Sequence, residues 1–127
     1  MILLNWESKI MKIYKQGTGK KYTPFNHFGM TTEAVFNPEL GSKHVNITIS
    51  TIPKGAGSDD EVHENSDQIF YVMSGIMSVF CEGKLLHTVE KGNAIMIEAG
   101  DVHAVMNESD EDLVFYAVTA PPLEKTH

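Results

Sequence analysis

Two short stretches of this chain carry side chains that could bind a metal ion. The first holds Glu61, His63 and Gln68, and the second ends at His103. Carboxylate, imidazole and amide groups are all donors that divalent transition metals accept. Alternate residues of a β-strand project from the same face, so Glu61 and His63 are expected to point the same way. Together the two stretches could supply four donors to one ion.

The elements that would position these donors are predicted to be β-strands. Residues 43–52 alternate between apolar and polar side chains, which is typical of a strand. Glycine-containing turns then separate short apolar runs at intervals of about 8–12 residues, up to a last strand at 113–120 that Pro121 ends. No window predicts an amphipathic helix, and only residues 31–40 leave room for a helical turn. The pattern predicts an all-β sandwich or barrel.

Composition limits what the protein can bind and where it works. The chain has 127 residues and a formal charge of -7, which suits one domain over 1–127 and argues against a nucleic-acid partner. All ten basic residues are lysines, so no guanidinium fork is available for a phosphate or polycarboxylate. A single cysteine, Cys81, excludes an internal disulfide and favours a reducing, cytoplasmic location. Residues 1–10 are too short to cross a bilayer, and we interpret them as an edge strand, an arm across a partner subunit or a dispensable extension.

The spacing of the two stretches resembles the two motifs of the cupin family. Motif 1, at 55–75, runs from Gly55 through Glu61, His63 and Gln68 to Gly75 with the family's intervals. Motif 2, at 92–107, has the family's order of residues in Gly92, Gly100, His103 and Asn107. The resemblance implies a double-stranded β-helix, or jelly-roll, barrel with a metal inside. It also implies a homodimer.

Three motif positions depart from the family pattern. Glu61 stands where the family has its first histidine, Gln68 replaces its glutamate, and Glu98 replaces a proline. A register that starts at His63 leaves too few residues before Gln68, so we prefer the register that starts at Glu61. The two ligand changes together keep the formal ligand charge at -1.

The resemblance therefore implies one divalent transition metal (Fe, Mn, Zn, Ni or Co). Its ligands would be Glu61, His63, Gln68 and His103. The alternative is a barrel without metal, in which Glu61 ends an acidic run and Gln68 is a hydrogen-bonding residue at the barrel mouth.

A small-molecule pocket is expected around these ligands. Strand alternation places Phe70 on the face of Gln68, and we assign Met96 and Tyr116 to the same pocket, with Phe115 on the outer face. His27 is either a loop residue or a side chain that reaches the pocket mouth. No nucleophile stands beside a base, so no catalytic residue is assigned.

Two functions fit this pattern. The first is a metal-dependent lyase, isomerase or dioxygenase that acts on a small oxygenated metabolite. The alternative is a non-catalytic barrel that binds or senses a sugar or sugar-acid, with or without metal. Both predict a small-molecule ligand and a homodimer without nucleic-acid or membrane partners.

Overall fold

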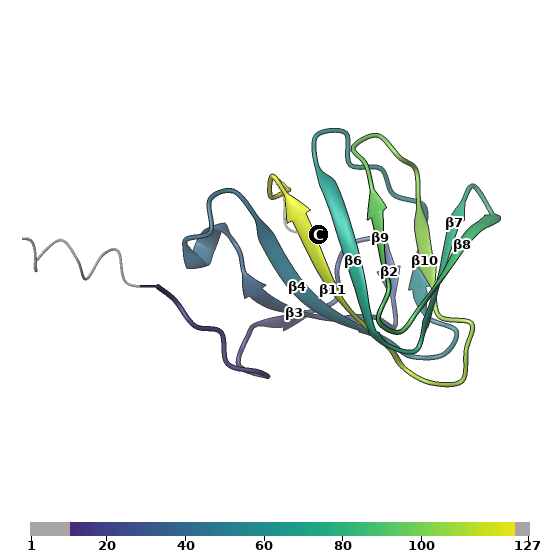
Figure 1. Cartoon of the computed structure of the whole chain (residues 1–127), viewed down its shortest axis with the longest axis horizontal. Coiled ribbons are helices and arrows are strands. Elements are labelled where there is room, and N and C mark those ends of the chain that lie inside the picture. Colours follow the sequence, from purple (N-terminus) through teal and green to yellow (C-terminus); the bar gives the residue numbers. More distant parts are fainter. Residues whose placement is uncertain (1–10, 124–127) are drawn as a thin grey trace, which may run out of the picture.

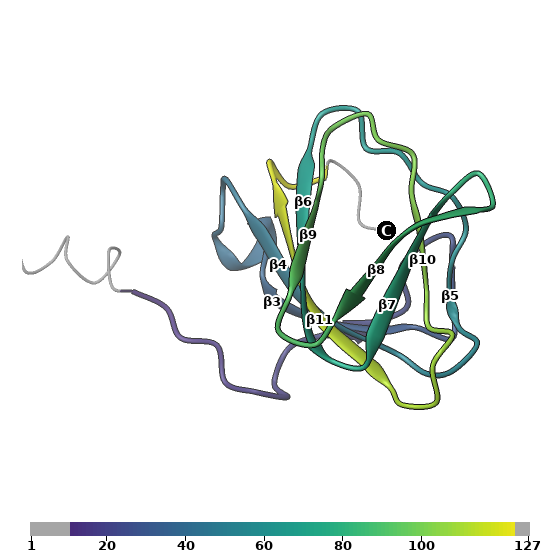
Figure 2. The ribbon, with the colours of Figure 1, turned by 45° about the vertical axis from the view of Figure 1, so that its right-hand side comes forward.

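The protein folds as two antiparallel β-sheets that face each other, as the computed structural model shows for residues 11–123 (Figures 1 and 2). The prediction of an all-β barrel is confirmed. The predicted arm at 1–10 lies outside the described residues. The strands are β1 (Lys21–Tyr22), β2 (His27–Phe28), β3 (Thr31–Phe36), β4 (Asn46–Ile52), β5 (Gly57–Ser58), β6 (Asp67–Ser74), β7 (Ile76–Cys81), β8 (Lys84–Glu90), β9 (Ala94–Ile97), β10 (Ala104–Met106) and β11 (Leu113–Ala120).

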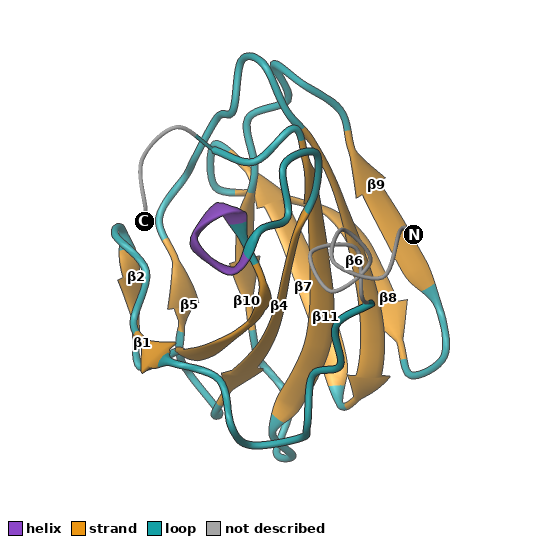
Figure 3. Cartoon of the chain, turned by 90° about the vertical axis from the view of Figure 1, so that its left-hand side faces the viewer, coloured by secondary structure: helices purple, strands orange, loops and turns teal. Residues whose placement is uncertain are grey.

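One sheet has the strand order β1-β3-β4-β11-β6-β9, and the other has the order β2-β5-β10-β7-β8. Figure 3 shows that strands dominate and that one short helical turn interrupts them. This turn is a 3-10 helix, Pro38–Leu40, and the Asn37 side chain caps it by accepting a hydrogen bond from the Leu40 amide. It falls within the segment 31–40, where the sequence left room for one. Within residues 11–123, no helix has the length and apolar character needed to cross a bilayer.

The hydrophobic core lies between the two sheets. Its fully buried side chains include Ile52, Val72, Met77 and Leu113. Asn107 is also fully buried, and its side-chain amide donates to the carbonyl oxygens of Ile52 and Glu111. Ile52 and Leu113 pair across β4 and β11, so packed side chains fill this part of the interior.

Over residues 47–50, strand β4 buries its polar side chains and places its apolar ones on the outer face, the reverse of the usual arrangement. Its polar residues Thr48 and Ser50 are buried, whereas Ile47 and Ile49 lie on the outer face and keep partial exposure. The register explains the orientation, because Thr48 pairs with Ala34 on one side and with Ala117 on the other, and both alanines are buried. The barrel interior beside β4 is thus lined by hydroxyl groups.

Gly75 makes the turn between β6 and β7 and lies against the start of β11. Its φ angle is +75°, and a Cβ atom there would lie 2.5 Å from the carbonyl oxygen of Asp112. Gly83, in the β7–β8 hairpin turn, has a similar φ of +81° but nothing within 4 Å of the position of a Cβ. The two glycines share a backbone conformation that disfavours other residues, and only Gly75 also needs the space.

This difference predicts unequal effects of two alanine substitutions. Gly83→Ala should lower the free energy of unfolding by roughly 1–2 kcal/mol through the left-handed backbone alone. Gly75→Ala should lower it by roughly 3 kcal/mol or more, because the new methyl group also meets the backbone of β11. Urea unfolding of both variants measures the difference. Equal losses would show that the contact with Asp112 relaxes freely.

Candidate functional site

Motifs 1 and 2 are joined by a backbone bridge at their predicted metal-binding residues. The Glu61 amide donates to the carbonyl oxygen of His103 at 2.7 Å, and the His103 amide donates to that of Glu61 at 2.9 Å. A third bond, from the Gly100 amide to the His63 carbonyl, continues the pairing. Residues about forty positions apart in sequence are thus held side by side at one end of the cavity.

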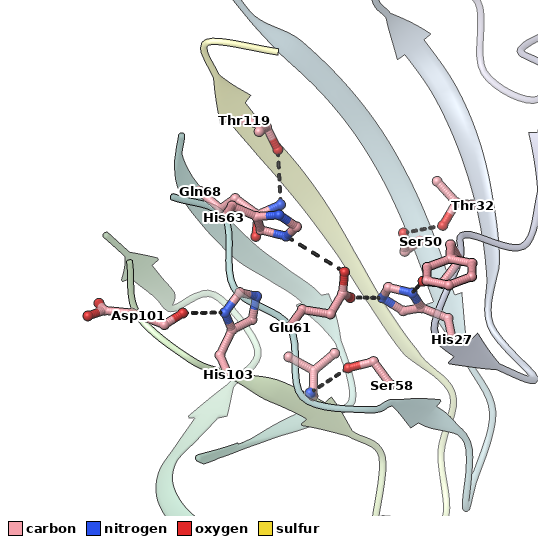
Figure 4. Close-up of polar contacts among 12 residues, drawn as sticks. His27, Thr32, Ser50, Ser58, Glu61, His63, Gln68, Asp101, His103 and Thr119 are labelled. Atoms are coloured by element: carbon pink, nitrogen blue, oxygen red, sulfur yellow. Dashed lines mark hydrogen bonds and ion pairs between the residues drawn. The ribbon is translucent and has the colours of Figure 1, made fainter. Parts of the chain in front are cut away.

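Gln68 and His27 reach this site from two other strands. Gln68 lies near the start of β6, where it pairs with Ile97 of β9 and with Thr119 of β11. His27 lies on β2 and pairs with Ser58, three residues before Glu61. Figure 4 shows Glu61 between His27 and His63, with His103 and Gln68 beside them. The structure therefore brings all four predicted ligands together and adds His27.

The Glu61 carboxylate is the centre of this group. One oxygen lies 3.1 Å from Nε2 of His27, and the other lies 3.8 Å from Nε2 of His63. Its side chain is only 8% exposed. Burial, together with the nearby negative charge of Asp59, raises the pKa of Glu61 to about 7. Below about pH 7 this carboxyl group is therefore mainly protonated, and a nearby cation would favour loss of the proton.

Two of the imidazoles are oriented by backbone carbonyls. Nδ1 of His27 lies 2.7 Å from the carbonyl oxygen of Phe25, and Nδ1 of His103 lies 3.0 Å from that of Asp101. A carbonyl only accepts, so each Nδ1 carries the hydrogen and each Nε2 is left toward the site (Figure 4). This outer contact is the arrangement by which proteins fix metal-binding histidines.

Gln68 contributes an oxygen that the protein itself does not use. Its Nε2 donates to Oγ1 of Thr119 at 3.1 Å, which fixes the orientation of the amide. Its Oε1 is buried and has no hydrogen-bond partner among the described residues. A buried polar atom without a partner costs roughly 1–3 kcal/mol, so a ligand or cation at this point would remove an existing penalty.

The donors fit a metal ion in kind, although they do not yet converge on one point. Carboxylate, imidazole and amide oxygen suit Fe, Mn, Co, Ni and Zn. Within residues 11–123, no three His, Cys, Asp or Glu side chains are already gathered as a complete set of ligands. A cation would interact favourably with two groups here, the unpartnered Oε1 of Gln68 and the buried carboxyl group of Glu61.

The site opens into a cavity of about 670 Å³ between the two sheets. The predicted pocket residues His27 and Phe70 line it, as do Glu61, His63, Gln68 and His103. Other lining residues include apolar ones, Met30, Val105 and Phe115, hydroxyl-bearing ones, Thr32, Thr48, Ser50, Ser58 and Thr119, and the charged Lys20 and Glu39.

Met96 and Tyr116 do not line this cavity, so their assignment to the pocket is wrong. Met96 is 54% exposed, because its neighbours Ile95 and Ile97 take the inner face of β9. Tyr116 pairs with the exposed Tyr71 on the outer face of β11. Phe115, which was expected outside, is 2% exposed and lines the cavity instead. These runs are apolar on both faces, so alternation did not reveal which face is buried.

Comparison with known proteins gives one family and several similar structures. The family profile described as "Cupin domain" matches residues 48–119, more than half of the chain. No curated protein sequence matches. The polyketide cyclase RemF from Streptomyces resistomycificus has a TM-score of 0.77 at 19% identity, covering 93% of this chain and 84% of that one.

Two further solved structures are similar. A predicted oxalate decarboxylase from Thermotoga maritima has a TM-score of 0.74 at 18% identity, covering 87% of this chain and 99% of that one. KdgF from Halomonas sp. has a TM-score of 0.73 at 18% identity, covering 91% and 97%. At these identities the likeness shows the shared fold.

The raised pKa of Glu61 predicts a pH-dependent stability in metal-depleted protein. Between the ordinary value of 4.5 and about 7, the native state keeps a proton that the unfolded state releases. The free energy of unfolding that Glu61 contributes should therefore fall as the pH rises through this window. Urea unfolding of wild type and Glu61→Gln across the window measures the contribution as their difference.

The matched control is Glu64→Gln, which changes an exposed carboxylate on the same loop. Its difference from wild type should not follow the same course. A wild-type minus Glu61→Gln difference that is flat, or that grows with pH, would contradict the prediction.

Proposed function

Because the chain belongs to the cupin domain family, we propose that its barrel binds one divalent transition metal and acts on a small oxygenated metabolite in the cavity. The observation that carries the proposal is the buried, unpartnered Oε1 of Gln68 beside the buried carboxyl group of Glu61. Both groups are costly to bury as they stand, and one cation would satisfy both.

Each donor has a distinct part in this proposal. Nε2 of His103 is held toward the site by the carbonyl of Asp101, and Glu61 and His63 lie next to it. Gln68 would supply a neutral oxygen, with its amide kept in place by Thr119. A bound metal would polarise a carbonyl or enediol oxygen of the substrate, or activate water or dioxygen. This chemistry corresponds to a lyase, isomerase or dioxygenase.

The other cavity residues would position the substrate and manage a proton. Phe70, Val105 and Phe115 form an apolar part of the wall that limits access of water to the reacting group. His27 is the group placed to hold or transfer a proton, because its Nε2 faces the cavity side of Glu61 at 3.1 Å. The similar structures carry different activities in their names, so the proposed reaction class rests on this site's own donors.

A second candidate function is a barrel that binds or senses a small molecule without metal. The observation that favours it is the contact between His27 and Glu61, which already gives the carboxyl group a partner. In this case the pair shares one proton, and Gln68 is left to bind an oxygen-linked hydrogen of the ligand. Metal content separates the two functions.

The metal proposal predicts near-stoichiometric transition metal in protein purified from metal-supplemented cells. Glu61→Ala, His63→Ala and His103→Ala should each lower metal affinity by roughly tenfold or more, since each removes one donor. His87→Ala is the matched control, because this histidine is exposed on β8 away from the cavity. Elemental analysis by mass spectrometry gives the content. Less than about a tenth of an equivalent of transition metal per chain in every wild-type preparation would contradict the metal proposal and favour the metal-free function.

Gln68 gives a second and separable prediction. Gln68→Glu adds a charged donor and should raise metal affinity by roughly tenfold, whereas Gln68→Leu should lower it by a similar factor. Because Oε1 has no partner in the metal-depleted protein, Gln68→Leu should cost little stability, less than about 1 kcal/mol. Isothermal titration with Mn²⁺ or Zn²⁺ and urea unfolding measure the two effects. A large loss of stability without a change in metal affinity would assign Gln68 a purely structural role.

A further inference from the structure

We propose that the ligand of this cavity is a small polyhydroxylated molecule, and that its hydroxyl groups bind a part of the cavity wall that carries hydroxyl side chains. This hydroxyl wall consists of Thr32, Thr48, Ser50 and Thr119. The inference rests on the proposed function only in that it uses the same cavity, and it holds with or without a bound metal.

The wall exists because three strands turn hydroxyl-bearing residues inward. Thr32 of β3, Thr48 and Ser50 of β4, and Thr119 of β11 are all less than 8% exposed, and all four line the cavity. On β4 the inward hydroxyls alternate with outward isoleucines, Ile47 and Ile49. A barrel that only needed a stable core would place these isoleucines inside.

The hydrogen bonds of the wall leave donors unused. Thr32 and Ser50 share one bond, 2.8 Å long, and therefore keep one O–H hydrogen between them (Figure 4). Thr119 accepts from Nε2 of Gln68, so its own O–H hydrogen is also available. Thr48 has no hydrogen-bond partner among the described residues. These hydroxyl groups face the cavity, where water or a polar ligand can complete their hydrogen bonds.

The neighbours of Thr48 provide room for such a molecule. Across the sheet Thr48 is paired with Ala34 and Ala117, the smallest side chains that a strand can place beside it. The next residue in this row is Phe70, two strands from Thr48 and roughly 10 Å away across the sheet. A short carbon chain with one end at Glu61 and its hydroxyl groups along this row would meet both parts of the site.

Apolar ligands fit this wall poorly. An alkyl chain would bury the free hydroxyl groups of Thr48 and Thr119 without replacing the water that they bind, which costs roughly 1–3 kcal/mol for each group. A ligand with several hydroxyl groups replaces that water directly. Recognition by hydroxyl groups also fits a chain without arginine, because it requires no anionic group on the ligand.

The test compares ligands that differ only in their hydroxyl groups. Stereoisomeric hexonates such as D-gluconate are compared with hexanoate, and hexitols such as sorbitol are compared with 1-hexanol, by titration calorimetry. At least one polyol of each set should bind roughly tenfold more tightly than its deoxygenated counterpart. The measurement is made on metal-depleted and on metal-loaded protein, because hexonates also bind free metal.

Two valine variants on the same strand supply the structural control. Thr48→Val, which keeps the shape of the side chain, should weaken polyol binding by roughly three- to tenfold. Thr51→Val, on the outer face of β4, should change it less than about twofold. Thr48→Val should also leave the midpoint of thermal unfolding unchanged or higher, whereas a hydroxyl group with only a structural role would lower it.

Three results would overturn the proposal. They are equal or tighter binding of hexanoate and hexanol, no binding of any polyol at tens of millimolar, and polyol binding that Thr48→Val leaves unchanged. Polyol binding that depends on Thr48 in a protein that never retains metal would support the hydroxyl wall and refute the metal centre. Metal binding without any preference for ligands with hydroxyl groups would support the metal centre and refute the role of the hydroxyl wall.

Discussion

The pair of backbone hydrogen bonds between Glu61 and His103 is the constraint on which the site depends. These bonds fix two side chains from distant parts of the sequence at one depth in the barrel. His63 follows Glu61 by two residues, and its carbonyl oxygen accepts a hydrogen bond from the Gly100 amide, in the turn that precedes His103. Because the backbone carries this pairing, the side chains at these positions can change from one donor type to another without moving the site. Glu61 is an example, because a carboxylate stands here where the family pattern has a histidine.

The inverted polarity of β4 links the cavity to the outside of the barrel. With Thr48 and Ser50 inside, Ile47 and Ile49 must lie outside, since the side chains of a strand alternate. The register extends this outer apolar face, because Ile49 pairs with Tyr116 and Tyr116 pairs with Tyr71. In this chain the polar wall inside is thus accompanied by apolar side chains on the outer face of the same strand. Tyr116 belongs to that surface for the same reason that Phe115 lines the cavity.

The sequence predicted much of the fold and the centre of the site, because both depend on local spacing. Turn residues at regular intervals indicated the strands, and motif spacing indicated Glu61, Gln68 and His103 together. The contact of His27 with Glu61 could not be predicted, since it depends on the pairing of β2 with β5 rather than on any interval along the chain. The positions of Met96 and Tyr116 were predicted wrongly, because a strand that is apolar on both faces gives no period from which its inner face can be inferred.

The buried carboxyl group of Glu61 makes metal binding and proton binding alternatives at one atom. Burial and the charge of Asp59 raise its pKa to about 7, so the group is readily protonated near neutral pH, and a positive charge beside it favours loss of the proton. A protonated His27 or His63, or a bound divalent cation, could supply this charge. A site that holds metal therefore releases a proton on loading, and a site that holds none keeps that proton shared between Glu61 and His27. The same backbone arrangement supports either state, because the backbone hydrogen bonds that position Glu61 do not depend on the charge of its side chain.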